Sequence, residues 1–139
     1  MRLSLTTWNI NSVRLRIDLV AKFLKSARPD VLCLQETKCI DDAFPLKRFK
    51  RLGYEHVALN GQKGYHGVAI ASKLPLTEDH RQDYCKVGDP RHISALLQVG
   101  SRRIRLHNFY VPAGGAERHR SIHPKFGYKL DLVVGVQAS

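Results

Sequence analysis

The chain has 139 residues, and its 23 Lys and Arg against 12 Asp and Glu give a formal net charge of +11. The length fits one domain, and the 43% apolar and 25% charged residues are ordinary for a globular protein, which excludes a disordered tail or a fibrous repeat. No apolar run reaches the roughly 18 residues of a membrane helix, no signal peptide is evident, and the three cysteines lack zinc-site spacing, so we expect a cytoplasmic protein without a membrane partner.

The first 35 residues predict a strand, a helix and a second strand. Leu3 to Ile10 combines apolar residues with β-favouring threonines and is typical of a strand. Ser12 is the expected N-cap of a helix whose apolar residues recur every three or four positions and which ends at Arg28-Pro29. Val31 to Leu34 is a continuous apolar run, as in a strand buried on both faces. Together they predict a βαβ unit with parallel strands.

Polar side chains follow both strands of this unit. Asn9 and Asn11 come at the end of the first strand, and Gln35 and Glu36 come at the end of the second. Because ligands of such sheets bind outside the carboxyl ends of the strands, we expect Asn9 and Glu36 to converge. A carboxylate beside an amide offers the oxygen ligands that suit Mg²⁺. The alternative is a glutamate that only caps a turn or forms an ion pair.

The remainder of the chain predicts shorter elements without a linker or repeat. Residues 125–132 begin like a helix after Pro124. The predicted sheet then has four or five strands, with one face or edge uncovered. Between the βαβ unit and residue 125, the sequence predicts the following elements in order: a short helix near 45–52, an extended stretch over 54–59, a glycine-rich loop over 61–67, a strand over 68–72, an irregular charged segment over 74–91, and a hairpin of 93–99 and 102–111.

Tyr110 and several basic runs are further candidates for chemistry. Tyr110 is the last residue of a predicted strand before a turn, and it could present its hydroxyl to a phosphate oxygen. The alternative is a structural role, as a half-buried aromatic side chain at a strand end. The basic charge favours a polyanionic partner such as DNA, RNA or an anionic membrane surface. Taken together with Tyr65 and Tyr110, the lysines and arginines favour contacts to a phosphate backbone. Each basic run taken alone is typical of a solvent-exposed surface.

Four motifs, in order, resemble the exodeoxyribonuclease III and AP endonuclease family of the endonuclease/exonuclease/phosphatase superfamily. They are 7–14 (TWNINSVR), 34–38 (LQETK), 61–69 (GQKGYHGVA) and 108–115 (NFYVPAGG), and they match only the N-terminal half of the family pattern. The resemblance implies an α+β fold, namely a partial four-layer α/β sandwich of the DNase-I-like kind with one mixed sheet and flanking helices. It also implies a single, truncated domain over residues 1–139.

The same resemblance implies a Mg²⁺-dependent phosphodiesterase, with Mn²⁺ as the alternative ion. Such an enzyme cuts double-stranded DNA 5′ to abasic sites and removes nucleotides from 3′ ends, and no obligate protein partner is expected. Carried over by motif, Asn9 and Glu36 are the metal-site residues and Tyr110 is a catalytic residue near the scissile phosphate. The residues expected to contact DNA are Arg91, Arg14, Tyr65 and Asn11.

The chain departs from the family pattern after Tyr110. The family continues with a Gly-Asp-x-Asn motif that supplies a base, and later with an Asp-His pair, and neither follows here. Residues 133–139 read like the end of a frameshifted or truncated gene. We therefore expect an incomplete nuclease. The alternative is an inactive fragment that binds DNA or Mg²⁺ weakly.

Overall fold

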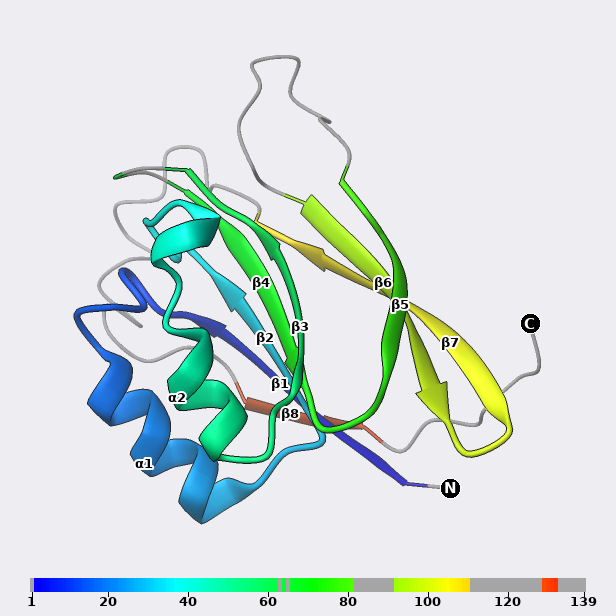
Figure 1. Cartoon of the computed structure of the whole chain (residues 1–139). Coiled ribbons are helices and arrows are strands. Elements are labelled where there is room, and N and C mark those ends of the chain that lie inside the picture. The colour runs from blue at the N-terminus through cyan, green and yellow to red at the C-terminus, as the bar shows by residue number, and fades with distance from the viewer. Residues whose placement is uncertain (1, 63, 65, 82–91, 111–128, 133–139) are drawn as a thin grey trace, which may run out of the picture.

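The computed structural model of the chain describes residues 2–62, 64, 66–81 and 92–110, and the backbone of 129–132. Within these residues the chain forms eight strands, two α-helices and one 3-10 helix (Figure 1). In chain order the elements are β1 (Leu3–Asn9), α1 (Ile17–Ala27), β2 (Val31–Gln35), the 3-10 helix (Asp41–Ala43), α2 (Leu46–Arg51), β3 (His56–Asn60), β4 (Val68–Ser72), β5 (Leu76–His80), β6 (His92–Val99), β7 (Arg102–Phe109) and β8 (Lys129–Leu132).

The strands form two sheets. The first has the order β3-β4-β2-β1-β8 and the second has the order β5-β6-β7. Strands β1 and β2 are parallel, with Asn9 opposite Gln35, and the other pairs of the first sheet are antiparallel. The predicted βαβ unit is thus confirmed, and the carboxyl ends of its two strands lie together at one end of the sheet.

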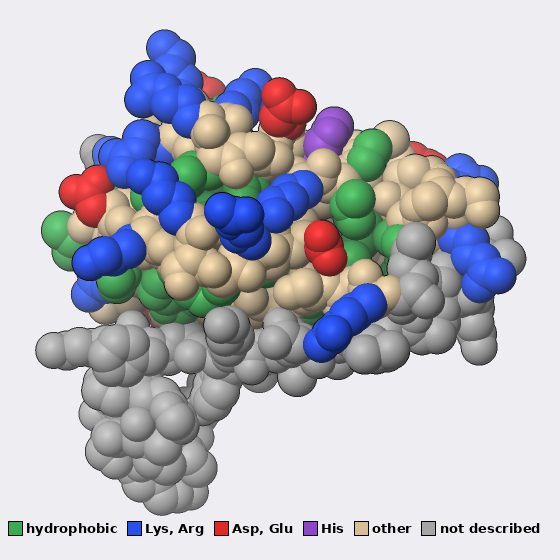
Figure 2. Space-filling view, turned by 90° about the horizontal axis from the view of Figure 1, so that it is seen from below, with side chains coloured by type: hydrophobic (Ala, Val, Ile, Leu, Met, Phe, Trp, Pro, Cys, Tyr) green, Lys and Arg blue, Asp and Glu red, His purple; other side chains and the backbone are tan. Residues whose placement is uncertain are grey.

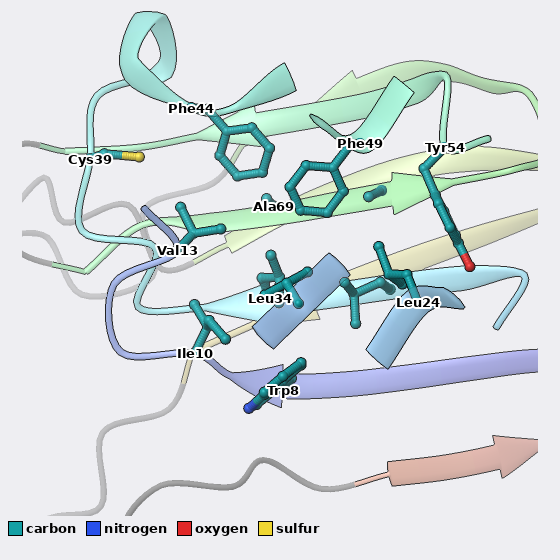
Figure 3. Close-up of a cluster of buried hydrophobic side chains, with 13 residues drawn as sticks. Trp8, Ile10, Val13, Leu24, Leu34, Cys39, Phe44, Phe49, Tyr54 and Ala69 are labelled. Carbon is teal, nitrogen blue, oxygen red and sulfur yellow. The ribbon is translucent and has the colours of Figure 1, made fainter. Parts of the chain in front are cut away.

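Helices α1 and α2 cover one face of the first sheet (Figure 1). Between them lies a cluster of buried side chains that includes Leu24, Leu34 and Phe49 (Figure 3). The rings of Phe44 and Phe49 stack at 5.1 Å between centroids, and Trp8 meets Phe23 edge to face at 5.4 Å. This cluster holds the βαβ unit together.

The second sheet packs against the other face of the first. Side chains of β6, among them Ile93 and Leu97, share a buried cluster with Val31 and Cys33 of β2. Alternate residues of β2 therefore face opposite layers, which explains its continuous apolar run. Burial raises the pKa of the Cys33 thiol to about 12. The fold class is confirmed, and residues 76–109 add strands that cover the face expected to be open.

Three local predictions differ from the structure. Helix α1 begins at Ile17 rather than after Ser12, because residues 13–16 form turns; the Ser12 hydroxyl accepts a 3.3 Å hydrogen bond from the Leu15 amide and so caps these turns rather than α1 itself. The segment expected to be irregular contains β5, whose exposed, charged residues hide its pairing with β6. Residues 129–132 were expected within a helix but form β8, antiparallel to β1.

The sequence predicts no membrane-spanning helix. Neither α-helix in the described part of the chain has the length and hydropathy that a bilayer crossing requires.

Candidate active site

Asn9 and Glu36 meet where β1 and β2 end. Asn9 is the last residue of β1 and Glu36 follows β2, and the Asn9 Nδ2 donates a 2.5 Å hydrogen bond to Glu36 Oε2. The expected convergence of these two side chains is therefore confirmed. Asn9 is exposed and Glu36 is half-buried, so both are accessible to a ligand.

The loops after β1 and β2 continue side by side beyond the strands. The amides of Ser12 and Val13 donate to the carbonyls of Glu36 and Thr37 at 2.9 and 3.1 Å. Glu36 has a φ of 56°, in the left-handed region of the backbone that residues other than glycine rarely adopt. Surrounding contacts are needed to maintain such a conformation, and residues of this kind cluster at functional sites.

Lys38 places a positive charge at the Glu36 carboxylate. Its Nζ is 3.7 Å from Glu36 Oε1 and donates a 2.6 Å hydrogen bond to Asn11 Oδ1. The carboxylate thus has an ammonium group on one side and the Asn9 amide on the other.

The glycine-rich loop supports the chain around Glu36 from the other side. The amides of Thr37 and Lys38 donate to the carbonyls of Gly67 and His66 at 3.1 and 2.8 Å. Gly67 has a φ of 92°, and a Cβ atom there would collide with Thr37 Oγ1. At the start of the loop, the Gly61 amide donates a 2.7 Å hydrogen bond to Asp41 Oδ1. Both the positive φ and the close approach of Thr37 require glycine at position 67.

Asn108 of β7 links the second sheet to the floor of the site. Its Nδ2 donates to the carbonyls of Leu34 and Ala69 at 2.9 and 2.8 Å, and its Oδ1 accepts a 2.8 Å bond from Gln35 Nε2. Gln35 also donates to Thr7 Oγ1 at 2.9 Å. The sequence analysis did not single out Asn108 or give Gln35 this role. The available signal was an Asn inside a strand two residues before Tyr110.

Tyr110 lies two residues after Asn108 and contacts the glycine-rich loop. Its ring centroid is 5.9 Å from that of His66, whose carbonyl accepts the Lys38 amide. Tyr110 therefore joins the site through the loop, whereas Asn9 and Glu36 are in direct contact. Of the expected DNA contacts, Asn11 and Arg14 are exposed on the loop after β1, while Tyr65 and Arg91 lie outside the described residues.

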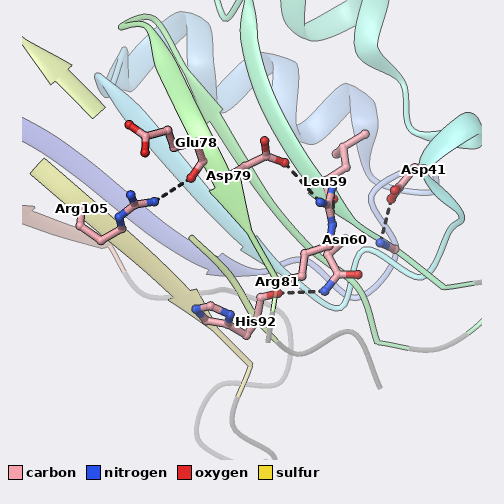
Figure 4. Close-up of polar contacts among 9 residues, drawn as sticks. Asp41, Leu59, Asn60, Glu78, Asp79, Arg81, His92 and Arg105 are labelled. Atoms are coloured by element: carbon pink, nitrogen blue, oxygen red, sulfur yellow. Dashed lines mark hydrogen bonds and ion pairs between the residues drawn. The ribbon is translucent and has the colours of Figure 1, made fainter. Parts of the chain in front are cut away.

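A second group of polar contacts lies between β3 and the second sheet, away from Glu36 (Figure 4). Asn60 Nδ2 donates a 2.8 Å bond to the carbonyl of His92, and Arg81 donates to the carbonyl of Leu59. Asp79, in the one Asp-His dipeptide of the chain, has its Oδ2 3.3 Å from Arg81 Nη1. This dipeptide precedes the tyrosine motif, and its Asp79 pairs with Arg81, which in turn bonds to β3.

The donor set at Asn9 and Glu36 fits a hard cation that keeps part of its water. Mg²⁺ is bound in proteins by one or two carboxylates, with waters and substrate phosphates completing its six ligands. Among the described residues, no three His, Cys, Asp or Glu side chains form a metal-binding group, which disfavours an all-protein site for zinc. The Cys39 thiol, three residues after Glu36, is unsuited to metal binding, because burial raises its pKa more than the charge of Arg14 lowers it.

Comparisons with known proteins identify the family of the chain. Residues 6–134 match the model of the Endonuclease/Exonuclease/phosphatase family. Exodeoxyribonuclease III of Haemophilus influenzae is 32% identical over 127 residues, which cover 85% of this chain and 45% of that protein. An AP endonuclease from Archaeoglobus fulgidus is 39% identical, with a TM-score of 0.69 over 79% of this chain and 41% of its own.

A 3′ phosphatase from Neisseria, solved with a product DNA hairpin, is a further match. It is 34% identical, with a TM-score of 0.69 over 78% of this chain and 41% of its own. The chain thus spans less than half the length of these relatives. The resemblance drawn from the four sequence motifs, including its partial extent, is confirmed.

Proposed function

The chain belongs to the endonuclease/exonuclease/phosphatase family, and from this premise we propose that it carries the metal-binding part of a Mg²⁺-dependent DNA phosphodiesterase. The observation that carries the proposal is the contact of Asn9 with Glu36 at the carboxyl ends of two parallel strands. Glu36 and Asn9 would hold Mg²⁺, with Mn²⁺ as the alternative ion. Bound there, the ion would neutralise charge on the phosphate and stabilise the leaving oxygen.

The other residues of the site would orient the phosphodiester. Tyr110 would donate its hydroxyl to a phosphate oxygen beside the scissile bond. Lys38, whose ammonium group is 3.7 Å from the Glu36 carboxylate, would hold that side chain in position. Asn11 and Arg14 would contact the backbone from the loop after β1, and we retain Tyr65 and Arg91 as DNA contacts on the motif resemblance.

The proposed substrate is double-stranded DNA with abasic sites or 3′ ends. Supporting it are the relatives named exodeoxyribonuclease III and AP endonuclease, and the DNA hairpin in the structure of the Neisseria 3′ phosphatase. A net charge of +11 favours a polyanion of this kind. Cleavage 5′ to the abasic site and 3′ to 5′ degradation are the reactions that we propose.

A second candidate function is binding of DNA and Mg²⁺ without cleavage. It is favoured by the sequence after Tyr110, where no Gly-Asp-x-Asn motif supplies a base to activate water. Loss of groups that act as a unit removes most of the rate of an enzyme, so the two candidates differ sharply in turnover.

Magnesium binding tests the site directly. Mg²⁺ is titrated into the pure chain and into two variants, Glu36→Gln and Asp42→Asn, the latter removing an exposed carboxylate of the 3-10 helix. We expect Glu36→Gln to weaken Mg²⁺ binding by at least about tenfold, because it removes the one carboxylate of the pair. Asp42→Asn should change it less than about twofold. Equal affinity of Glu36→Gln and the unchanged chain would contradict the proposed metal site.

Cleavage distinguishes the two candidate functions. The same proteins are incubated with Mg²⁺ and a duplex that carries one abasic site, and the products are separated by size. Product that requires both Mg²⁺ and Glu36 supports the phosphodiesterase. Intact DNA at high protein concentration, together with Glu36-dependent Mg²⁺ binding, supports the binding function.

A further inference from the structure

A cavity of about 380 Å³ lies at the end of the molecule opposite Asn9 and Glu36, where α1 and α2 end (Figure 1). We call it the basic pocket, and its lining consists of Lys25, Arg28, Arg51, Lys73, Leu24 and Leu52. Figure 2 views the molecule from this end, where Lys and Arg side chains outnumber acidic ones. A neighbouring hollow of about 240 Å³ shares Arg28 and adds Arg2.

The elements around the basic pocket hold two of its cations in place. Arg28 Nε donates a 3.3 Å hydrogen bond to the carbonyl of Lys25, and Lys73 Nζ donates a 3.4 Å bond to the carbonyl of Arg28. Lys73 Nζ also lies 5.5 Å from the centre of the Tyr54 ring. The Tyr54 hydroxyl in turn donates to the carbonyl of Pro29 at 2.6 Å, which ties the ring beside Lys73 to the chain that follows α1.

Within the described part of the chain, no acidic side chain forms an ion pair with these cations. The ion pairs there join Lys38 to Glu36, Arg48 to Asp18 and Arg81 to Asp79. The Asp30 carboxylate acts on this region, because its charge contributes, after burial, to the raised pKa of Tyr54, whose ring lies beside Lys73. Two helix C-termini contribute about −0.5 charge each, and Asp30 adds one negative charge, against four positive side chains. About two positive charges remain to attract an anion.

From this excess charge in a small cavity, we propose that the basic pocket binds a compact chain of linked phosphate groups. Linked phosphates place several negative charges within a few ångströms of each other, which matches four cations around one hollow. A DNA strand carries one charge per 3.4 Å of helix axis, so it would engage only part of the pocket. The proposal does not depend on the phosphodiesterase function, because none of the residues that line the basic pocket belongs to the proposed active site.

Tripolyphosphate is the probe for the test, and its binding to the full chain is measured by calorimetry in the presence of a chelator, so that metal ions play no part. The pocket variant is Lys25→Gln with Arg51→Gln, two exposed side chains. The control is Lys22→Gln with Lys47→Gln, which removes the same charge from the same two helices outside the pocket. Circular dichroism verifies that both fold, and single Lys25→Gln replaces the pocket variant if needed.

We expect the pocket variant to bind tripolyphosphate at least about tenfold more weakly than the unchanged chain, and the control to differ less than about twofold. Four results would overturn the proposal. The first is the absence of binding to the unchanged chain, and the second is an equal loss in both variants, as in general attraction to a basic surface. The third is equally tight binding of inorganic phosphate. The fourth is a pocket variant that loses more affinity for duplex DNA than for tripolyphosphate.

Discussion

Asn108 joins the two sheets through three hydrogen bonds of one buried side chain. We predict that Asn108→Ala lowers the free energy of unfolding by about 2–4 kcal/mol, because the carbonyls of Leu34 and Ala69 and the amide of Gln35 lose their partner away from water. Asn60→Ala is the control, since the Asn60 side chain also links the sheets but does so through one hydrogen bond, to the carbonyl of His92. Urea unfolding measures both, and a loss for Asn108→Ala no larger than that for Asn60→Ala would contradict this role.

At the scale of elements, the glycine-rich loop sets the position of the chain after β2. We predict that Gly67→Ala lowers the free energy of unfolding by about 2–4 kcal/mol, because the added Cβ meets Thr37 Oγ1 in addition to the strain of positive φ. Gly53→Ala is the matched control, with a φ of 94° and no atom within 4 Å of its Cβ, and should lower it by about 1 kcal/mol. Equal effects in chemical denaturation would show that contact with Thr37 is unimportant.

At the scale of the whole molecule, the charge of +11 bears on the proposed association with DNA. We predict that the affinity for duplex DNA falls about 40-fold between about 50 and 200 mM salt, as expected when about three phosphate contacts displace counterions. Fluorescence anisotropy with a labelled duplex at constant Mg²⁺ measures the slope. Affinity that does not change with salt would contradict backbone contacts as the source of binding.

The sequence by itself determined the βαβ unit and the meeting of Asn9 with Glu36. Both follow from local pattern, because apolar spacing identifies the strands and helix, and parallel strands bring their carboxyl ends to one edge. The buried run of β2 likewise indicated layers on both of its faces, although not which residues would form the second one.

Only the tertiary structure decided the second sheet, the pairing of β8 with β1, the role of Asn108 and the basic pocket. Each depends on residues far apart in the chain: Asn108 is 73 positions from Gln35, and the pocket combines the ends of α1 and α2 with Lys73. The strand β5 shows the same limit, since its charged residues gave no apolar pattern and its partner β6 supplies the ladder. Periodicity reports which faces of an element are buried, whereas the identity of what covers them is fixed only when the layers pack.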